Sequence, residues 1–297
     1  MSQNIQIPPY FSLIEKGKVL LLLRDGFKDL LLEQGIEDFK SFLKKASQTS
    51  HYLKGRIPHP VIPLEDGKNM VLRQYSHGGL LRAITGSTYF FGSRSFRELT
   101  LTEEIRSCGI PTILSIGALH QRIFSSFYQA YLLSLEVPRS KDLIQYLQEI
   151  GDHPSREKLF QKRKIIHHIG LLIRQFHQAG FFHGDLQLKN ILLAGDQIFL
   201  IDFDRSYRRQ NLSIRERMKN LFRLNRSVDK WKCLGLPITW SDRRRFFLAY
   251  AGDDKDILEA MAKALRTYSL RFLFYRFSWT FEKIVHSSGF GVRSKIF

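Results

Sequence analysis

The sequence predicts an α+β fold of two lobes, an N-terminal lobe with an antiparallel sheet plus a helix and a mainly helical C-terminal lobe. Short apolar runs separated by turn residues dominate residues 1–135. Apolar residues at helical spacing dominate residues 136–297. A length of 297 residues is ample for one large domain or two lobes with their own cores.

The charge of the chain is unevenly distributed. The formal net charge is +18, and residues 205–297 hold 21 Lys and Arg against 8 Asp and Glu. This excess predicts a basic surface on the C-terminal part, suited to phospholipid head groups, a phosphorylated glycolipid or nucleic acid. A basic face that is only solvated is the alternative.

Cysteine usage and hydropathy indicate a cytosolic setting. Cys108 and Cys233 have no metal-ligand spacing and form no disulfide framework, which fits a reducing compartment. The first residues lack the basic start and apolar run of a signal peptide. No apolar stretch approaches the roughly 20 residues that span a bilayer.

Strands and helices alternate in the predicted N-terminal lobe. Residues 10–25 predict short strands, and residues 29–46 have the apolar spacing of one helix. A hairpin turn at residues 65–68 leads into a strand over residues 69–75. Residues 95–108 predict a helix that Gly109 and Pro111 close.

Two further positions are candidates for contacting a nucleotide. In the segment 54–64, Gly55 would let backbone amides approach a phosphate, although an ordinary turn explains the glycine as well. After strands at residues 113–119 and 126–135, the sequence Leu135-Glu136-Val-Pro138 breaks the pattern. It predicts a hinge between the lobes, where extended backbone at Glu136 would face an adenine edge.

Helices account for most of the predicted C-terminal lobe. Their expected ranges are 140–150, a long helix from a Ser155 cap to Gly180, a basic helix from about 214, a helix from a Ser241 cap to Tyr250, and 256–268. Three histidines on the long helix, His167, His168 and His177, have no acidic partner arranged with them, so we expect no metal there. Residues 270–281 mix aromatics with arginine, as in a buried helix or an interfacial membrane contact.

The stretch from His183 to Asp204 carries the chemistry. A loop with Asp185 and Asn190 leads into an apolar strand, a turn at residues 194–196 and a second apolar strand that ends at Asp202. Such a hairpin would bring Asp202 close to the other two residues. Oxygen ligands from Asn and Asp suit Mg²⁺, and a carboxylate suits the proton of a hydroxyl nucleophile.

This set resembles the catalytic residues of the protein-kinase fold. The resemblance implies that Asp185 meets the acceptor hydroxyl while Asn190 and Asp202 hold magnesium. It also places Arg73 where a kinase carries its phosphate-pairing lysine, with Glu98 as the partner. A surface arginine and a solvated glutamate are the alternative for that pair.

The chain as a whole resembles the bacterial lipopolysaccharide kinases, and most closely the 3-deoxy-D-manno-octulosonic acid (Kdo) kinases. The resemblance covers roughly residues 50–250. The stretches that carry it are residues 71–79, 95–98, 109–111, 183–193, 200–205 and 220–230. It implies a two-lobed kinase-like fold, ATP as phosphoryl donor with Mg²⁺, and a hydroxyl of Kdo on a lipid A precursor as acceptor. It further implies a peripheral location on the cytoplasmic face of the bacterial inner membrane, against an anionic surface.

Departures from the protein-kinase pattern favour a small-substrate kinase. Gly184 stands in place of arginine, Asp204 in place of glycine and Arg73 in place of lysine, and no full activation segment follows Asp204. Arginine and lysine present different donor geometry to phosphate. The alternatives are another sugar kinase of this fold, such as a core heptose kinase, or a non-catalytic kinase-like protein that binds membrane or RNA. No nucleic-acid module is recognisable, so nucleic acid is not an expected partner.

Overall fold

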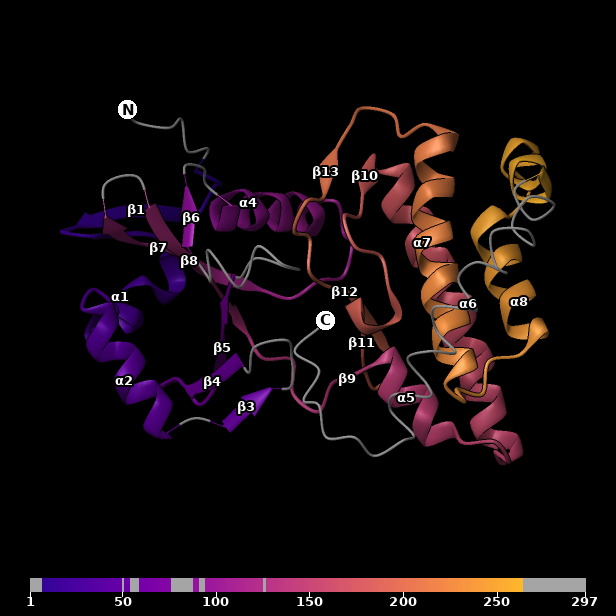
Figure 1. Ribbon diagram of the computed structural model, residues 1–297, viewed down its shortest axis with the longest axis horizontal. Helices are drawn as coiled ribbons and strands as arrows, with labels where there is room; N and C mark the ends of the chain where they lie inside the picture. Colours follow the sequence, from indigo (N-terminus) through magenta and orange to yellow (C-terminus); the bar gives the residue numbers. More distant parts are fainter. Residues whose placement is uncertain are drawn as a thin grey trace. The chain divides into compact units, whose positions relative to one another are not determined.

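The computed structural model describes residues 7–49, 51–53, 59–75, 88–90, 94–124 and 127–263, and all structural statements here concern those residues (Figure 1). Within these residues the chain forms two compact units, one from the described residues up to 106 together with residues 113–137, and one from residues 107–112 and 138–263. The predicted α+β class is confirmed. The division predicted between residues 135 and 136, with nucleotide binding assigned to the first part, stays a prediction.

The first unit is built on an 8-stranded antiparallel sheet. Its order is β1-β2-β7-β8-β5-β4-β3, with β6 paired to β8. The strands are β1 (Phe11–Lys16), β2 (Val19–Arg24), β3 (His51–Leu53), β4 (His59–Pro63), β5 (Asn69–Gln74), β6 (Thr88–Phe90), β7 (Ser115–Phe124) and β8 (Phe127–Leu135). The predicted hairpin turn before β5 is confirmed, because the Leu64 N–H donates to the Lys68 carbonyl at 2.8 Å.

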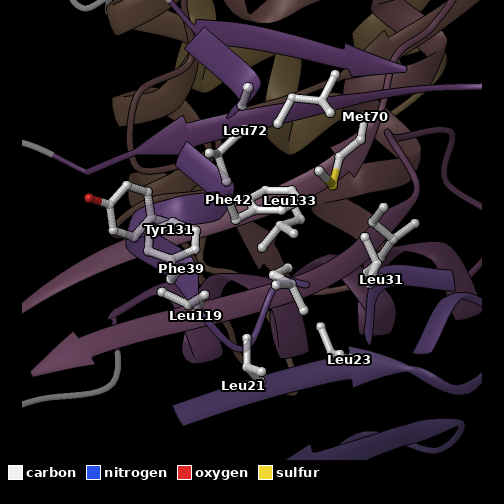
Figure 2. Close-up of a cluster of buried hydrophobic side chains, with 14 of the residues drawn as sticks. Leu21, Leu23, Leu31, Phe39, Phe42, Met70, Leu72, Leu119, Tyr131 and Leu133 are labelled. Carbon is white, nitrogen blue, oxygen red and sulfur yellow. The ribbon is translucent and has the colours of Figure 1, made fainter. Parts of the chain in front are cut away.

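Helices cover both faces of this sheet. They are α1 (Asp25–Glu33), α2 (Phe39–Thr49) and α4 (Arg94–Ser107). Leu21 and Leu23 of β2 point toward α1 and α2, in the cluster of buried side chains that Figure 2 shows. Leu22, between them, joins the cluster that contains Phe96 of α4. Successive residues of a strand point to opposite faces of the sheet, and both faces are covered here, which explains why β2 is apolar from Val19 to Leu23.

The single helix predicted over residues 29–46 is wrong. Gly35 has φ +80°, and its N–H donates to the Leu32 carbonyl while the Ile36 N–H donates to Leu31. This is the Schellman arrangement that ends a helix, and glycine adopts the left-handed conformation it needs at little cost. The apolar spacing continues across the break because α1 and α2 both pack on one cluster.

The second unit is mainly helical. Its elements are β9 (Lys141–Asp142), α5 (Leu143–Ile150), α6 (Arg156–Gln178), β10 (Phe181–Phe182), the 3₁₀ helix η1 (Leu188–Asn190), β11 (Ile191–Ala194), β12 (Gln197–Leu200), β13 (Tyr207–Arg208), α7 (Ile214–Cys233) and α8 (Trp240–Ala251). Residues 255–263 are helical, and the segment 270–281 lies outside the described residues. The strands pair as β12-β11-β9 and β10-β13, which confirms the predicted hairpin.

Capping residues set the helix starts. The Ser155 hydroxyl accepts the Lys158 N–H, which confirms that predicted cap. The cap predicted at Ser241 is wrong, because Thr239 caps α8. The helix expected from residue 140 begins at Leu143, after the cap Asp142. Both caps form a capping box with the residue three positions on. Within the described part of the chain, the structure contains no helix whose length and apolar character would let it cross a membrane.

Candidate active site

The loop between β10 and β11 carries Asp185 and Asn190, and one asparagine of α7 holds its start. Asn220 Nδ2 donates to the His183 carbonyl at 2.9 Å, and Asn220 Oδ1 accepts the His183 N–H at 2.9 Å. Asn220 has no exposed surface. Because buried backbone groups are costly to leave without partners, these bonds fix the main chain two residues before Asp185.

The His183 ring joins this loop to the strand before Asp202. Its Nδ1 accepts the Asp185 N–H at 3.0 Å, so its Nε2 carries the proton and donates to the Ile201 carbonyl at 3.1 Å. Burial lowers the pKa of His183 to about 4, while the carboxylates of Asp202 and Asp185 act in the opposite direction. The ring is therefore neutral at pH 7, as its hydrogen bonds require.

A second buried histidine supports Asn220. His177 Nε2 lies 3.1 Å from Asn220 Oδ1, which has no proton, so the nitrogen is the donor. His177 Nδ1 then accepts the hydroxyl of Tyr250 on α8 at 2.7 Å. Burial lowers the pKa of His177 to about 3, which keeps it neutral. Residues on α6, α7 and α8 thus combine to fix one loop.

Replacing Asn220 tests this support. We expect Asn220→Leu to lower the free energy of unfolding by about 3 kcal/mol, because the buried His183 N–H and carbonyl both lose their partner. Urea denaturation measures the change. Asn211→Leu, at an exposed position just before α7, is the control, and we expect it to stay within about 0.5 kcal/mol of wild type. Equal stability of the two variants would contradict this role.

The Asp185 carboxylate is part-exposed and surrounded by donors. Gln187 Nε2 donates to its Oδ1 at 2.5 Å, and Arg223 Nη1 lies 3.2 Å from the same oxygen. Lys189 Nζ lies 3.7 Å from Oδ2. The carboxylate is held in a fixed orientation yet remains accessible, with 31% of its side chain exposed. That combination suits a group that accepts a proton from a bound hydroxyl.

Asn190 and Asp202 have the donor set that fits Mg²⁺. Asn190 Nδ2 donates to the Asp185 carbonyl at 2.7 Å, so its Oδ1 is the atom left for a cation. The Ile201 N–H donates to the Asn190 carbonyl at 3.1 Å, which brings Asp202 beside it. Among the described residues no group of three His, Cys, Asp or Glu forms a metal centre. Two oxygen ligands from the protein are enough for Mg²⁺, because this ion usually fills its other coordination positions with water and with phosphate oxygens of the substrate.

Backbone geometry after β12 is unusual at Asp202, where φ is +66°. Non-glycine residues rarely adopt this conformation, and such strain clusters at functional sites. The following turn also explains Gly184: a Cβ there would lie 2.2 Å from the Asp204 carbonyl oxygen. The Gly184 N–H donates to the Ser206 hydroxyl at 2.8 Å. The arginine that protein kinases carry at this position would not fit.

The first unit contains the predicted Arg73–Glu98 pair. Arg73 Nη2 lies 2.5 Å from Glu98 Oε2, and Glu98 is buried. The Tyr75 hydroxyl donates to the same carboxylate oxygen and accepts from Arg73 Nη2 at 3.0 Å. Burial, and next the negative charge of Glu98, raise the pKa of Tyr75 well above its usual value, while Arg73 acts in the opposite direction. The ion pair between Arg73 and Glu98 is thus present, and its contact with nucleotide phosphates stays a prediction.

The other two nucleotide positions are less defined. Gly55 lies outside the described residues. The Glu136 N–H donates to the Asn69 carbonyl at 2.8 Å, and its carboxylate accepts from Asn69 Nδ2 at 2.8 Å. That N–H is thus engaged within the first unit, and an adenine contact would use other backbone atoms of this segment.

Tyr75 beside the Arg73–Glu98 pair, and Asn220 and Arg223 beside the loop of Asp185, are among the site residues that the sequence did not predict. The α7 residues Asn220, Arg223 and Ser227 are spaced three and four apart, so they share the face that contacts the loop. Ser227 accepts the Leu188 N–H at 3.3 Å. Polar residues at that spacing inside an apolar stripe were the available signal.

Comparison with known proteins agrees with this geometry. The family model "Lipopolysaccharide kinase (Kdo/WaaP) family" matches residues 53–250, two thirds of the chain. The chain belongs to the Kdo/WaaP lipopolysaccharide kinase family. It is accordingly an ATP-dependent kinase of lipopolysaccharide biosynthesis.

Proteins named as Kdo kinases are about one third identical to this chain over the aligned residues. A 3-deoxy-D-manno-octulosonic acid kinase of Vibrio vulnificus (strain YJ016) is 35% identical over 177 residues, which cover 58% of this chain and 70% of that protein. One of Pasteurella multocida (strain Pm70) is 31% identical over 215 residues, covering 69% and 85%. The structure of WaaP in complex with acyl carrier protein aligns with a TM-score of 0.53 at 18% identity, over 84% of this chain and 99% of that one. This last likeness confirms the kinase-like fold.

Proposed function

We propose that this kinase transfers the γ-phosphoryl group of ATP to a hydroxyl of the Kdo sugar on a lipid A precursor. The observation that carries the proposal is the fixed, accessible Asp185 carboxylate on the loop that also carries Asn190, which hydrogen bonds join to Asp185 and to Ile201, the residue before Asp202. Similarity to several proteins named as Kdo kinases supports Kdo over a core heptose as acceptor.

Each site residue has a separate role in the proposed reaction. Asp185 accepts the proton of the acceptor hydroxyl as its oxygen bonds to the γ-phosphorus, and the bond from that phosphorus to the ADP oxygen breaks. Asn190 and Asp202 would hold Mg²⁺, which when bound neutralises charge on the phosphates. Arg73, fixed by Glu98 and Tyr75, is the proposed donor to the nucleotide phosphates.

Acceptor comparison tests the proposal. Purified protein is incubated with labelled ATP, Mg²⁺ and three separate acceptors: a Kdo-bearing lipid A precursor, a heptose-bearing core and a generic protein. We expect label on the Kdo lipid alone. Label on the heptose-bearing core alone would show that the acceptor is a heptose and not Kdo. No label on any of the three would overturn the proposal.

We further propose that the protein acts peripherally on the cytoplasmic face of the inner membrane. The hairpin of β7 and β8 supports this, because Ile123, Phe124 and Phe127 near its tip are exposed, Phe124 by 74%. Arg122, next to the tip, donates its backbone N–H to the carbonyl of the exposed Lys18 at 2.7 Å, and its guanidinium also lies 3.7 Å from the Glu15 carboxylate. Exposed apolar side chains with basic residues next to them suit the interface of an anionic bilayer.

Vesicle binding tests this membrane contact. We expect the triple variant Ile123→Ser, Phe124→Ser, Phe127→Ser to bind phosphatidylglycerol vesicles at least tenfold more weakly than wild type, because apolar burial drives the insertion. Co-sedimentation measures it. Phe160→Ser, which removes a side chain that is 66% exposed on α6, is the control. Equal binding by the triple variant and wild type would show that the tip of this hairpin does not bind the membrane.

A further inference from the structure

Two cations face the single carboxylate of Asp185. Arg223 Nη1 lies 3.2 Å from one oxygen and Lys189 Nζ 3.7 Å from the other. Asp185 is thus shared between two cations, and neither cation has this carboxylate to itself. A guanidinium that shares its carboxylate partner in this way can bind a second anion.

Arg223 uses only one of its nitrogens within the protein. Nη1 donates to the Gly184 carbonyl and to Asp185. Nε and Nη2 donate to no residue in the described part of the chain, and 32% of the side chain is exposed. A guanidinium with two adjacent donors available binds a carboxylate through two parallel hydrogen bonds.

The position of Arg223 is fixed by its neighbours on α7. Asn220, one turn before it, clamps His183, and Ser227, one turn after it, accepts the Leu188 N–H. These two contacts hold α7 against the loop on either side of Arg223, and the Gly184 carbonyl holds the guanidinium itself. Such fixed placement lowers the entropy cost of binding a ligand group.

We propose that Arg223 binds the carboxylate of an acidic sugar acceptor and thereby selects an acidic sugar over a neutral one. The inference rests on the proposed function, because the acceptor named there is an acid and carries a carboxylate near its hydroxyl groups. Asp185 then orients the reacting hydroxyl while Arg223 orients the acid group of the same sugar. Arg223 becomes a substrate-binding residue of the reaction.

A substrate–enzyme cycle tests the inference. The acceptors are the Kdo-bearing lipid A precursor and the same lipid with its Kdo carboxyl converted to the methyl ester, which removes the charge and keeps the hydroxyls. We expect wild type to show a kcat/KM that is roughly ten- to a hundredfold higher for the acid than for the ester, the range for a hydrogen bond between charged groups. We expect Arg223→Gln to reduce that preference to within about threefold, and Arg223→Lys to restore part of it.

Three controls separate this from other effects. Arg215→Gln removes the same charge from an exposed position on α7 and should keep the full preference for the acid. Lys189→Gln removes the other cation near Asp185, and it should slow both acceptors alike if that lysine acts only through the carboxylate. Thermal unfolding of each variant shows that the fold is kept, and the KM for ATP shows whether Arg223 acts on the nucleotide.

The outcomes are distinct. An unchanged acid preference in Arg223→Gln, or an equal loss on acid and ester with a raised KM for ATP, would overturn the inference and leave the proposed function intact. Failure of wild type to phosphorylate either lipid would overturn the proposed function, and this inference with it.

Discussion

Asp185→Asn should lower the rate of phosphoryl transfer by about a thousandfold, within the 10²–10⁴ range that general acid–base catalysis contributes. Asparagine keeps the shape of the side chain and an oxygen for Gln187 and Arg223, but it does not take up the hydroxyl proton. The loss should therefore appear in kcat, with nucleotide binding unchanged. Single-turnover transfer from labelled ATP measures it.

The control for Asp185→Asn is another carboxylate in the same unit. Asp196 is in the turn between β11 and β12, where it pairs with Lys164 at 2.8 Å. Asp196→Asn makes the same chemical change outside the loop and should retain wild-type kcat. Transfer by Asp185→Asn within tenfold of wild type would remove Asp185 from the role of base.

Asp202→Asn should abolish most of the dependence of nucleotide binding on Mg²⁺. Loss of residues that only support metal ligands costs about 10–100-fold in metal affinity, so removal of a charged ligand should cost at least tenfold. Asparagine is the chosen replacement because it tolerates the left-handed φ of +66° at this position, whereas alanine would add strain. Calorimetric titration with ATP, in Mg²⁺ and in EDTA, measures the difference.

A neighbouring aspartate provides the comparison for Asp202. Asp204 follows by two residues and is likewise partly exposed. Asp204→Asn should bind ATP in Mg²⁺ as wild type does, while both variants match wild type in EDTA. If Asp202→Asn keeps the full effect of Mg²⁺, or Asp204→Asn loses it, the assignment of the metal ligand is wrong.

Local sequence signals were sufficient to predict the β11–β12 hairpin, which lies between Asn190 and Asp202. β11 and β12 are short apolar runs around the turn Ala194-Gly195-Asp196, and both strands were predicted. Each feature depends on residues within a few positions of one another. The helix that leads to the loop was predicted for the same reason, since Ser155 and Gly180 mark its ends.

Contacts between distant residues were harder to predict. Arg223 and Asp185 are 38 positions apart. The spacing of Asn220, Arg223 and Ser227 predicts a shared helix face, but it does not predict which loop that face contacts. Tyr75 was read as the end of a strand, although its hydroxyl is the third member of the Arg73–Glu98 pair. The break between α1 and α2 depends on the conformation of Gly35, which apolar spacing does not report.

The position of the transferred phosphate tests the central claim most directly. Phosphorus–proton correlation NMR of the glycolipid product, made with wild-type protein, ATP and Mg²⁺, identifies the carbon that bears the new phosphate. We predict a phosphomonoester at a former hydroxyl of the Kdo sugar. A phosphate on another sugar or on the lipid A backbone, or inorganic phosphate as the sole product, would contradict the account.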